Sequence, residues 1–234
     1  MGALVNTAAV LLGGIVGLIL KQGLKQRYED IIMSALGVSV LFIGISGAME
    51  KMMTVSGNGL SSGGAILLSL SMAAGAIVGE ALNIEGKFEQ FGGWLKKKAG
   101  SGDSRFIEAF VNTSLTICIG AMAIVGSLND GILHDPSMLY TKAILDFPIV
   151  MVFTATLGIG SIFSAIPILI LEGGITLLAS LLAGILTDAV IANLSMVGSV
   201  LIFCVGVNLF FPFHVKVANM LPALVFAGLL TGIF

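Results

Sequence analysis

Two carboxylates lie deep inside long apolar stretches of this chain, where a charged side chain is costly. Asp146 and Glu172 are separated by residues that carry no charge, and each has a proline nearby, Pro148 or Pro167. A charge near the centre of a bilayer costs on the order of 3 kcal/mol or more, so both should face protein or water. Prolines free backbone carbonyls, which with a carboxylate can coordinate a cation or relay a proton. We predict that Asp146 and Glu172 couple transport to an ion; the alternative is an interfacial or capping role.

Further polar residues could extend a path from these carboxylates towards both membrane faces. Asp130 and Asn129 would attract a cation at an outer mouth, and Asn208 and Asn219 would line an inner mouth. Amides inside membranes more commonly hydrogen-bond between helices, which is the alternative for both inner asparagines. The predicted pathway for a solute or ion comprises Asp130, Asp146, Glu172, Asn129, Asn208 and Asn219.

The stretch LGIGSIFSAIP, residues 157–167, is predicted to interrupt a helix. Gly158, Gly160, Ser164 and Pro167 supply the break. Either a very tight turn joins two full helices here, or the segment is broken or re-entrant and lines the path, which requires shelter by protein or a water-filled cavity. The sequence places Asp146 towards the outer face and Glu172 towards the inner face, so a direct pair between them would need irregular backbone.

Other kinds of chemistry lack a matching constellation of residues. Cys118 and Cys204 lie in apolar segments without metal-ligand spacing and are interpreted as small packing residues. Paired histidines and Ser/His arrangements at helical spacing are missing from the sequence, so we expect no metal, no cofactor and no enzymatic activity. A net charge of -2 argues against a nucleic-acid partner, whose phosphates would demand a basic face.

The composition predicts an all-α protein embedded in a lipid bilayer. The chain is 57% hydrophobic and 10% charged, with a mean hydropathy of +1.09. A span needs about 20 apolar residues. Eight candidates fit one polytopic domain over 1–234: 3–20, 31–49, 63–83, 106–127, 142–162, 166–187, 191–210 and 216–234. The first is expected to be a retained helix rather than a signal peptide.

Basic residues predict the orientation of these spans. Most of the 11 Lys and Arg residues fall in alternate gaps, and such residues stay on the cytoplasmic side. Loops 21–30 and 84–105 are therefore predicted to be cytoplasmic, with both termini outside a bacterial inner membrane. In loop 84–105, Phe88, Phe91 and Trp94 share one helical face and should meet lipid headgroups; a docking site for a partner is the alternative.

Weak self-similarity relates the first three predicted helices to the last three. LLGGIVGLIL at 11–20 matches LLASLLAGIL at 177–186 in its pattern of large and small residues. The repeats would span 3–83 and 166–234, with central helices in 106–165, and the odd spacing makes the copies inverted. Inverted triplets recur in secondary transporters; a duplication kept only for packing is the alternative. G-x-x-x-G pairs, Gly13 with Gly17 and Gly75 with Gly79, predict close helix contacts, within the chain or in a homo-oligomer.

Several motifs resemble those of a known family. The run CIGAMAIVGSLNDGILHDPSMLYTKAILDF at 118–147, LGIGSIFSAIPILI at 157–170, GAIVGE at 75–80 and NMLPAL at 219–224 are similar to the YqgA/YdfK-type bacterial membrane proteins, labelled domain of unknown function 554. The resemblance implies a bacterial inner-membrane location and no established substrate. In the family pattern the position of Glu172 is more often an amide, which shifts weight to Asp130 and Asp146.

The sequence therefore favours a small α-helical transporter or channel-like permease for an ion or small polar solute, with H⁺ or Na⁺ as coupling ion. The alternative is a non-transporting membrane scaffold or sensor whose polar residues only pack helices. A polar, water-accessible cavity reaching Asp146 would favour transport. A dry bundle packed on glycine would favour the scaffold.

Overall fold

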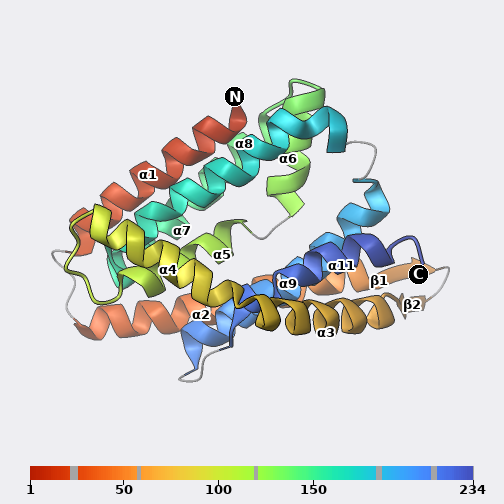
Figure 1. Ribbon diagram of the computed structural model, residues 1–234, viewed down its shortest axis with the longest axis horizontal. Helices are drawn as coiled ribbons and strands as arrows, with labels where there is room; N and C mark the ends of the chain where they lie inside the picture. The colour runs from red at the N-terminus through yellow and green to blue at the C-terminus, as the bar shows by residue number, and fades with distance from the viewer. Residues whose placement is uncertain (22–25, 57–58, 119–120, 183–185, 212–214, 234) are drawn as a thin grey trace. The chain divides into compact units, whose positions relative to one another are not determined.

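The computed structural model describes residues 1–21, 26–56, 59–118, 121–182, 186–211 and 215–233, which are almost entirely helical (Figure 1). The elements are α1 (Gly2–Lys21), α2 (Gln26–Met52), β1 (Met53–Ser56), β2 (Gly59–Ser62), α3 (Ala65–Leu82), α4 (Ile84–Lys98), α5 (Phe106–Cys118), α6 (Ala121–Ile132), α7 (Ser137–Leu157), the 3₁₀ segment η1 (Ile159–Ser164), α8 (Ala165–Leu182), α9 (Asp188–Phe210), α10 (Val217–Met220) and α11 (Pro222–Leu230). The protein is therefore an all-α membrane protein, as predicted.

Within these described ranges, six helical stretches are long and apolar enough to cross a membrane. They are Gly2–Lys21, Asp30–Met52, Ala65–Leu82, Ser137–Leu157, Ile159–Ala179 and Asp188–Phe210. The pair α5 and α6 passes the same test together, but the chain is bent by 60° between them. The predicted span 216–234 corresponds to the two short helices α10 and α11, so the count of eight crossings stays a prediction.

The helices group into two compact units. Unit 1 comprises Met1–Ser34, Gly86–Cys118 and Met122–Ala183, and unit 2 comprises Ala35–Glu85, Ile119–Ala121 and Gly184–Phe234. Both units are assembled from segments distant in sequence. The predicted repeats 3–83 and 166–234 each contribute to both: α1 and α8 lie in unit 1, whereas α3, α9 and α11 lie in unit 2.

In unit 1, α1 packs directly on α7, and the two helices lie side by side in Figure 1. A Cβ atom placed on Gly13 would meet the carbonyl of Phe147, and one on Gly17 would meet that of Met151. A step of four residues towards the C-terminus of α1 is matched by a step of four residues towards the C-terminus of α7, so the two helices are parallel. The G-x-x-x-G pair in α1 thus brings two backbones together without intervening side chains, as predicted.

The bent pair α5 and α6 runs the whole height of unit 1. At one end, Gly160 approaches the carbonyl of Phe106, close to where Lys21 ends α1. At the other end, Asp130 contacts Met1. The pair therefore passes from the Lys21 end to the Met1 end of unit 1, antiparallel to α7, which is the direction that a single broken span would take.

The predicted interruption at 157–167 joins two full helices. Gly158 ends α7 with φ 112, a left-handed conformation that favours glycine, and η1 leads into α8. Pro167 lies in the first turn of α8, where a missing N–H costs little. The tight-turn alternative is thus the one observed, and the bent element is α5–α6, within the region predicted as the single span 106–127.

Unit 2 is built on equally close helix seams. Cβ atoms on Gly75 and Gly79 would meet the backbone of Ala223 and Asn219, so α3 and α10–α11 are antiparallel. Gly44 packs on Phe203 in the same way, which joins α2 to α9. The strands β1 and β2 form a short antiparallel hairpin between α2 and α3 with Met53 opposite Ser62, an element absent from the sequence-based prediction.

The segment after α3 forms the amphipathic helix α4. Phe91 and Trp94 are exposed and stack on each other, as expected of a face that meets lipid headgroups. Phe88 differs from the expectation because it stacks on Phe110 of α5. One edge of α4 is therefore fastened to unit 1, and the other edge remains open.

Candidate functional site

Four polar side chains meet between three helices of unit 1. Lys142 and Asp146 lie one turn apart on α7, Asn6 lies on α1, and Glu172 lies on α8. All four are buried, with Glu172 and Asn6 0% exposed. We refer to these four residues as the Lys142 cluster.

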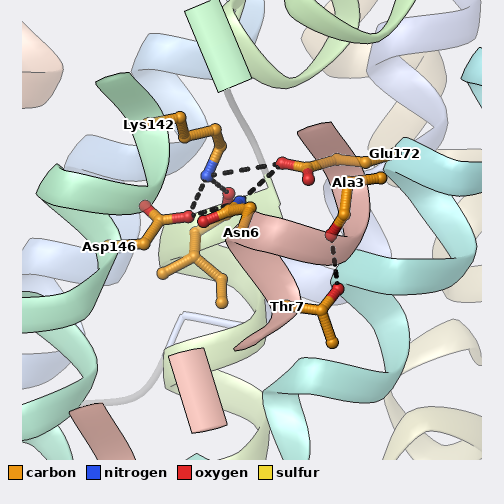
Figure 2. A network of polar contacts seen from close by, with 7 residues as sticks. Ala3, Asn6, Thr7, Lys142, Asp146 and Glu172 are labelled. Atoms are coloured by element: carbon orange, nitrogen blue, oxygen red, sulfur yellow. Dashed lines mark hydrogen bonds and ion pairs between the residues drawn. The ribbon is translucent and has the colours of Figure 1, made fainter. Parts of the chain in front are cut away.

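Figure 2 shows the side chains of Lys142, Asp146 and Glu172 converging on Asn6. The Lys142 ammonium forms an ion pair with Asp146 and lies 3.8 Å from Glu172 Oε1. The Asn6 amide donates to Asp146 Oδ2 at 3.0 Å and to Glu172 Oε1 at 2.8 Å. One amide and one ammonium thus hold the two carboxylates together at the same depth.

This meeting corrects the sequence-based expectation that Asp146 and Glu172 lie at different depths. The expectation assumed a helix over 142–162, whereas α7 runs from Ser137 to Leu157. The shift moves Asp146 more than a turn further from the start of its helix. A pair of regular helices is therefore enough to bring the two acids together.

The break between α5 and α6 supplies a further ligand to the cluster. Lys142 Nζ donates a hydrogen bond of 2.8 Å to the carbonyl of Ile117, in the last turn of α5. Carbonyls in the last turn of a helix lack an intrahelical donor and form the negative end of the helix dipole. The lysine therefore satisfies a backbone group that the end of α5 leaves free.

The charges in the Lys142 cluster do not balance. Two carboxylates face one ammonium, so the fully ionised cluster carries one excess negative charge. Asn6 Oδ1 and Glu172 Oε2 are buried, and neither has a hydrogen-bond partner among the described residues. A buried carboxylate oxygen without a partner is costly, and a proton or a cation would remove the cost.

The apolar surroundings close the cluster to solvent. Val10, Val150 and Ile168 form a fully buried group beneath it together with Ile117. Cys118 packs against this group as a small side chain. Asp146 is 4% exposed, so among the residues that the structure describes it is closed off from solvent, unlike the water-accessible site that would favour transport.

A cavity of about 530 Å³ with a mixed polar and apolar lining lies at the Met1 end of unit 1. Its lining includes Asp130, His134, Tyr140 and Thr176. Asp130 is itself buried and accepts hydrogen bonds from the amino group of Met1 and from the backbone N–H of Gly2. We call this cavity the Asp130 vestibule.

Asp130 and Asn129, which were predicted to form an outer mouth, both lie near the end of α6. Asn129 precedes Asp130 on α6, and its backbone carbonyl accepts from Leu133 and Asp135 at the end of that helix. Asp130 thus lines a cavity, as an outer mouth would require, while the backbone of Asn129 ends the helix.

Asn208 and Asn219, which were predicted to line an inner mouth, lie in unit 2 and form hydrogen bonds with the neighbouring chain. Asn208 accepts from the backbone N–H of Val215 and donates to its carbonyl, at 2.7 and 2.8 Å. Asn219 accepts from the backbone N–H of Glu85 and donates to Glu80. Each amide therefore fastens a chain segment in place. Both asparagines belong to unit 2, whereas the Lys142 cluster belongs to unit 1, and His214 lies outside the described residues.

Lys216 completes the contacts around Glu80. Its ammonium lies 2.7 Å from the Glu80 carboxylate, and both side chains are more than half exposed. The hydrogen bond and charge of Glu80 raise the pKa of Lys216, so this lysine stays charged at neutral pH. An exposed pair of this kind contributes little to stability.

The predicted break residues sit at the Lys21 end of unit 1. Ser164 donates to the carbonyl of Ser161 within η1. Gly158 lies against the ion pair between Lys21 and Asp103, and Gly160 against α5. These residues pack helices tightly and lie at the opposite end of α7 from the Asp130 vestibule.

Two members of the cluster were missed by sequence reasoning. Lys142 is the first residue of the predicted span 142–162 and was given no role there, although it lies four residues before Asp146, the spacing of a helical ion pair. It was also one of only two basic residues in the predicted external gaps, which is a signal against an exposed position. Asn6 gave no signal beyond being an amide in an apolar helix.

Metal chemistry has no visible site in the part of the chain that the structure describes. Groups of three or more His, Cys, Asp or Glu side chains that could hold an ion do not occur among those residues. The Lys142 cluster is therefore a site for charge and hydrogen bonding, with oxygen and nitrogen groups alone.

Comparison with known proteins places the chain in a family. The family model described as a protein of unknown function, DUF554, matches residues 1–231. The chain belongs to the DUF554 family. Within it, the chain is 31% identical over 234 residues to the uncharacterized protein YqgA of Escherichia coli, covering 97% of this chain and 94% of YqgA. It is 28% identical over 223 residues to the uncharacterized membrane protein YdfK of Bacillus subtilis, covering 95% of this chain and 92% of YdfK. No solved structure matches this DUF554 chain.

Proposed function

We propose that this protein is a multi-pass transporter for a small polar solute or ion, and that the Lys142 cluster binds its coupling cation, H⁺ or Na⁺. The excess negative charge of the buried cluster carries the proposal. Helix packing alone requires neutral hydrogen-bonding groups or matched charges. An unmatched buried carboxylate is costly to keep and is instead typical of residues that bind and release ions within membranes.

The helix directions support an inverted repeat. Asn6 contacts Glu172 while Gly14 contacts Ile162, so α1 and α8 are antiparallel. In unit 2, α2 is antiparallel to α9 because Gly37 meets Phe210 whereas Gly47 meets Ser199. The helices α3 and α11 are antiparallel as well. All three pairs that the repeat would relate by a two-fold axis in the membrane plane therefore have the required directions.

The discontinuous element beside the cluster also agrees with transporter design. Inverted-repeat transporters place ion sites beside discontinuous helices whose backbone carbonyls face the ion. Here Glu172 and Asn6 come from the two helices that the repeat would relate, and the carbonyl of Ile117 comes from the bent pair.

The distribution of charge supports the predicted orientation. Lys21 and Asp103 pair at one end of unit 1, and the side chain of Lys98 lines a pocket with Phe163 at the same end. Asp130 lies at the opposite end. With basic residues on the cytoplasmic side of a bacterial inner membrane, the Asp130 vestibule faces outwards.

The test is flux into proteoliposomes containing purified protein, measured for a panel of ions and metabolites under H⁺ or Na⁺ gradients. Asp146→Asn leaves one carboxylate against Lys142 and balances the cluster. We expect gradient-driven flux in the wild type and flux at the background of empty liposomes in Asp146→Asn. Glu50→Gln, which changes an exposed carboxylate on α2, should keep the wild-type rate.

A non-transporting scaffold is the second candidate, favoured by the closed surroundings of Asp146. Both carboxylates are capped by Asn6, as they would be if they only joined helices. Wild-type protein that neither moves nor binds any member of the panel would support the scaffold and overturn transport. Transporters pass through occluded states, so a closed site is compatible with both candidates, and flux separates them.

A further inference from the structure

Glu172 of the Lys142 cluster and Thr176 of the Asp130 vestibule lie one helical turn apart on α8, and this spacing indicates which ion binds and from which end. We propose, on the basis of the proposed function, that the coupling ion is a proton, that Glu172 Oε2 carries it, and that it arrives from the Asp130 vestibule through the hydroxyl of Thr176.

A proton fits the cluster better than a metal cation. Hard metal cations take several oxygen ligands arranged around them. In the cluster, Lys142 already contacts Asp146, Glu172 Oε1 and the Ile117 carbonyl. Asn6 Oδ1 and Glu172 Oε2 are buried and have no partners among the described residues, and a metal ion there would lie beside an ammonium. A proton needs one oxygen and no additional space.

The charged groups around Glu172 explain why a single proton is enough to neutralise the cluster. From α7 it faces Lys142 and Asp146, and from α1 it faces Asn6. From α5, the Cys118 thiol packs against the apolar group that includes Ile168 of α8. Asp130 and His134 lie further out, in the vestibule. Protonation of Glu172 leaves Lys142 balanced by Asp146, and the excess charge of the cluster is removed.

Thr176 lies between the vestibule and Glu172. It follows Glu172 by four residues on α8, so the two side chains lie on the same face of the helix. Thr176 lines the vestibule, yet its hydroxyl oxygen is buried and has no hydrogen-bond partner in the described chain. The Thr176 hydroxyl is thus a polar group at the boundary between a cavity and a buried acid. Among the described residues it makes no structural hydrogen bond that would account for its burial.

The transfer is balanced by exchange at this hydroxyl. Thr176 Oγ1 accepts a proton from water in the vestibule while its own O–H proton passes towards Glu172 Oε2. One O–H bond breaks on the water or hydronium and one breaks on the threonine, while one forms on the threonine and one forms on the carboxylate. Hydroxide remains in the vestibule if water supplied the proton, and neutral water remains if hydronium supplied it.

Infrared spectroscopy of reconstituted protein tests this proposal without a known solute. A protonated carboxyl group has a carbonyl stretch that a carboxylate lacks. We expect this band to appear after a downward pH jump in the wild type and to be absent in Glu172→Gln, which converts the acid to an uncharged amide of nearly the same shape.

The relay is tested by the rate at which the band appears. Thr176→Val keeps the shape and removes the hydroxyl, so the rate should fall at least tenfold while the final amplitude is unchanged. Thr176→Ser retains the hydroxyl and should restore the wild-type rate. Thr141→Val is the control, because this exposed hydroxyl on α7 bonds only the carbonyl of Ser137 and should leave the rate unchanged.

The outcomes separate this inference from the proposed function. If the band persists in Glu172→Gln, the proton acceptor is wrong. If Thr176→Val protonates at the wild-type rate, the route is wrong. If solute flux follows a Na⁺ gradient and the wild type has no such band, the proton inference is overturned while transport stands; absence of all flux overturns transport itself.

Discussion

Lys142 is the residue that compensates the buried negative charges of Asp146 and Glu172. Its ammonium faces two carboxylates, and its removal would leave two negative charges beside each other in an apolar interior. This makes Lys142 a structural requirement whatever the ion, and it distinguishes the residue from the exposed lysines of the chain.

Lys142→Met should therefore lower stability strongly. Breaking a buried ion pair on one side costs about 3–5 kcal/mol, because the remaining charge is uncompensated. Thermal unfolding in detergent should show a large drop for Lys142→Met and substantial recovery in Lys142→Met/Asp146→Asn. Lys51→Met, which removes an exposed pair with Glu50, should change little. Equal effects of the Lys51 and Lys142 variants would contradict the buried assignment.

The asparagines of unit 2 should behave differently from those of the cluster. Asn219 joins the start of α4 and Glu80 through its side chain. Asn219→Leu leaves the N–H of Glu85 without that acceptor and should destabilise the fold by about 1–3 kcal/mol. The carboxyl band of Glu172 should remain. Loss of that band in Asn219→Leu would instead support the inner-mouth role that the sequence suggested.

Sequence alone located two of the four cluster residues. Asp146 and Glu172 could be found because a carboxylate in an apolar stretch is costly wherever it lies. Their partners could not, because Lys142 falls at the predicted boundary of a span and its burial depends on where α7 begins. Asn6 is recognisable only once α1 is placed against α7 and α8.

At the scale of the helices, the glycines divide into two classes. Gly13 and Gly17 lie against the carbonyls of Phe147 and Met151, so there is no room for a methyl group. Gly173 and Gly174, just after Glu172 on α8, face almost empty space. The first class brings helices together, and the second lowers the helix propensity of α8 beside the candidate ion site.

Alanine substitutions should separate the two classes. Gly17→Ala would force α1 and α7 apart and should destabilise by about 1–3 kcal/mol, the usual cost of overpacking. Gly174→Ala meets no neighbour and should stabilise the helix by about 1 kcal/mol. Thermal unfolding of both variants shows whether each substitution stabilises or destabilises the protein. A stabilising Gly17→Ala would contradict the direct backbone contact.

The element boundaries were predicted unevenly for physical reasons. The long spans α1, α3 and α9 are continuous apolar runs, and their prediction was close. The bend between α5 and α6 was not predicted because the sequence between them has a single glycine and no proline, whereas the two glycines and the proline at 157–167 drew attention to a junction that proved to be a tight turn. Apolar sequence reports where a helix can lie and gives little information about where it bends.

At the scale of the whole molecule, the inverted repeat and the orientation stay predictions. They require the β1–β2 hairpin and the segment after α4 to lie on opposite sides of the membrane, since α3 lies between them. The hairpin residues are exposed, so they can be labelled without disturbing a core.

Impermeant maleimide labelling of intact cells tests this arrangement. In a background with Cys118 and Cys204 replaced by alanine, Ser62→Cys should be labelled from outside, and Ser101→Cys should be labelled only after lysis. The opposite pattern would reverse the orientation. Labelling of both sites in intact cells would show that α3 does not cross.

The glycine seam between α1 and α7 limits how the protein can move. Two helices that touch along their main chains form a stiff post, since sliding would lift one ridge over another. Access to Glu172 must then come from the other walls of the cluster, which are α8 and the bent pair α5–α6 packed on it at Gly131. A transport cycle in this protein would thus be a movement of α8 and the α5–α6 pair about a fixed α1–α7 post.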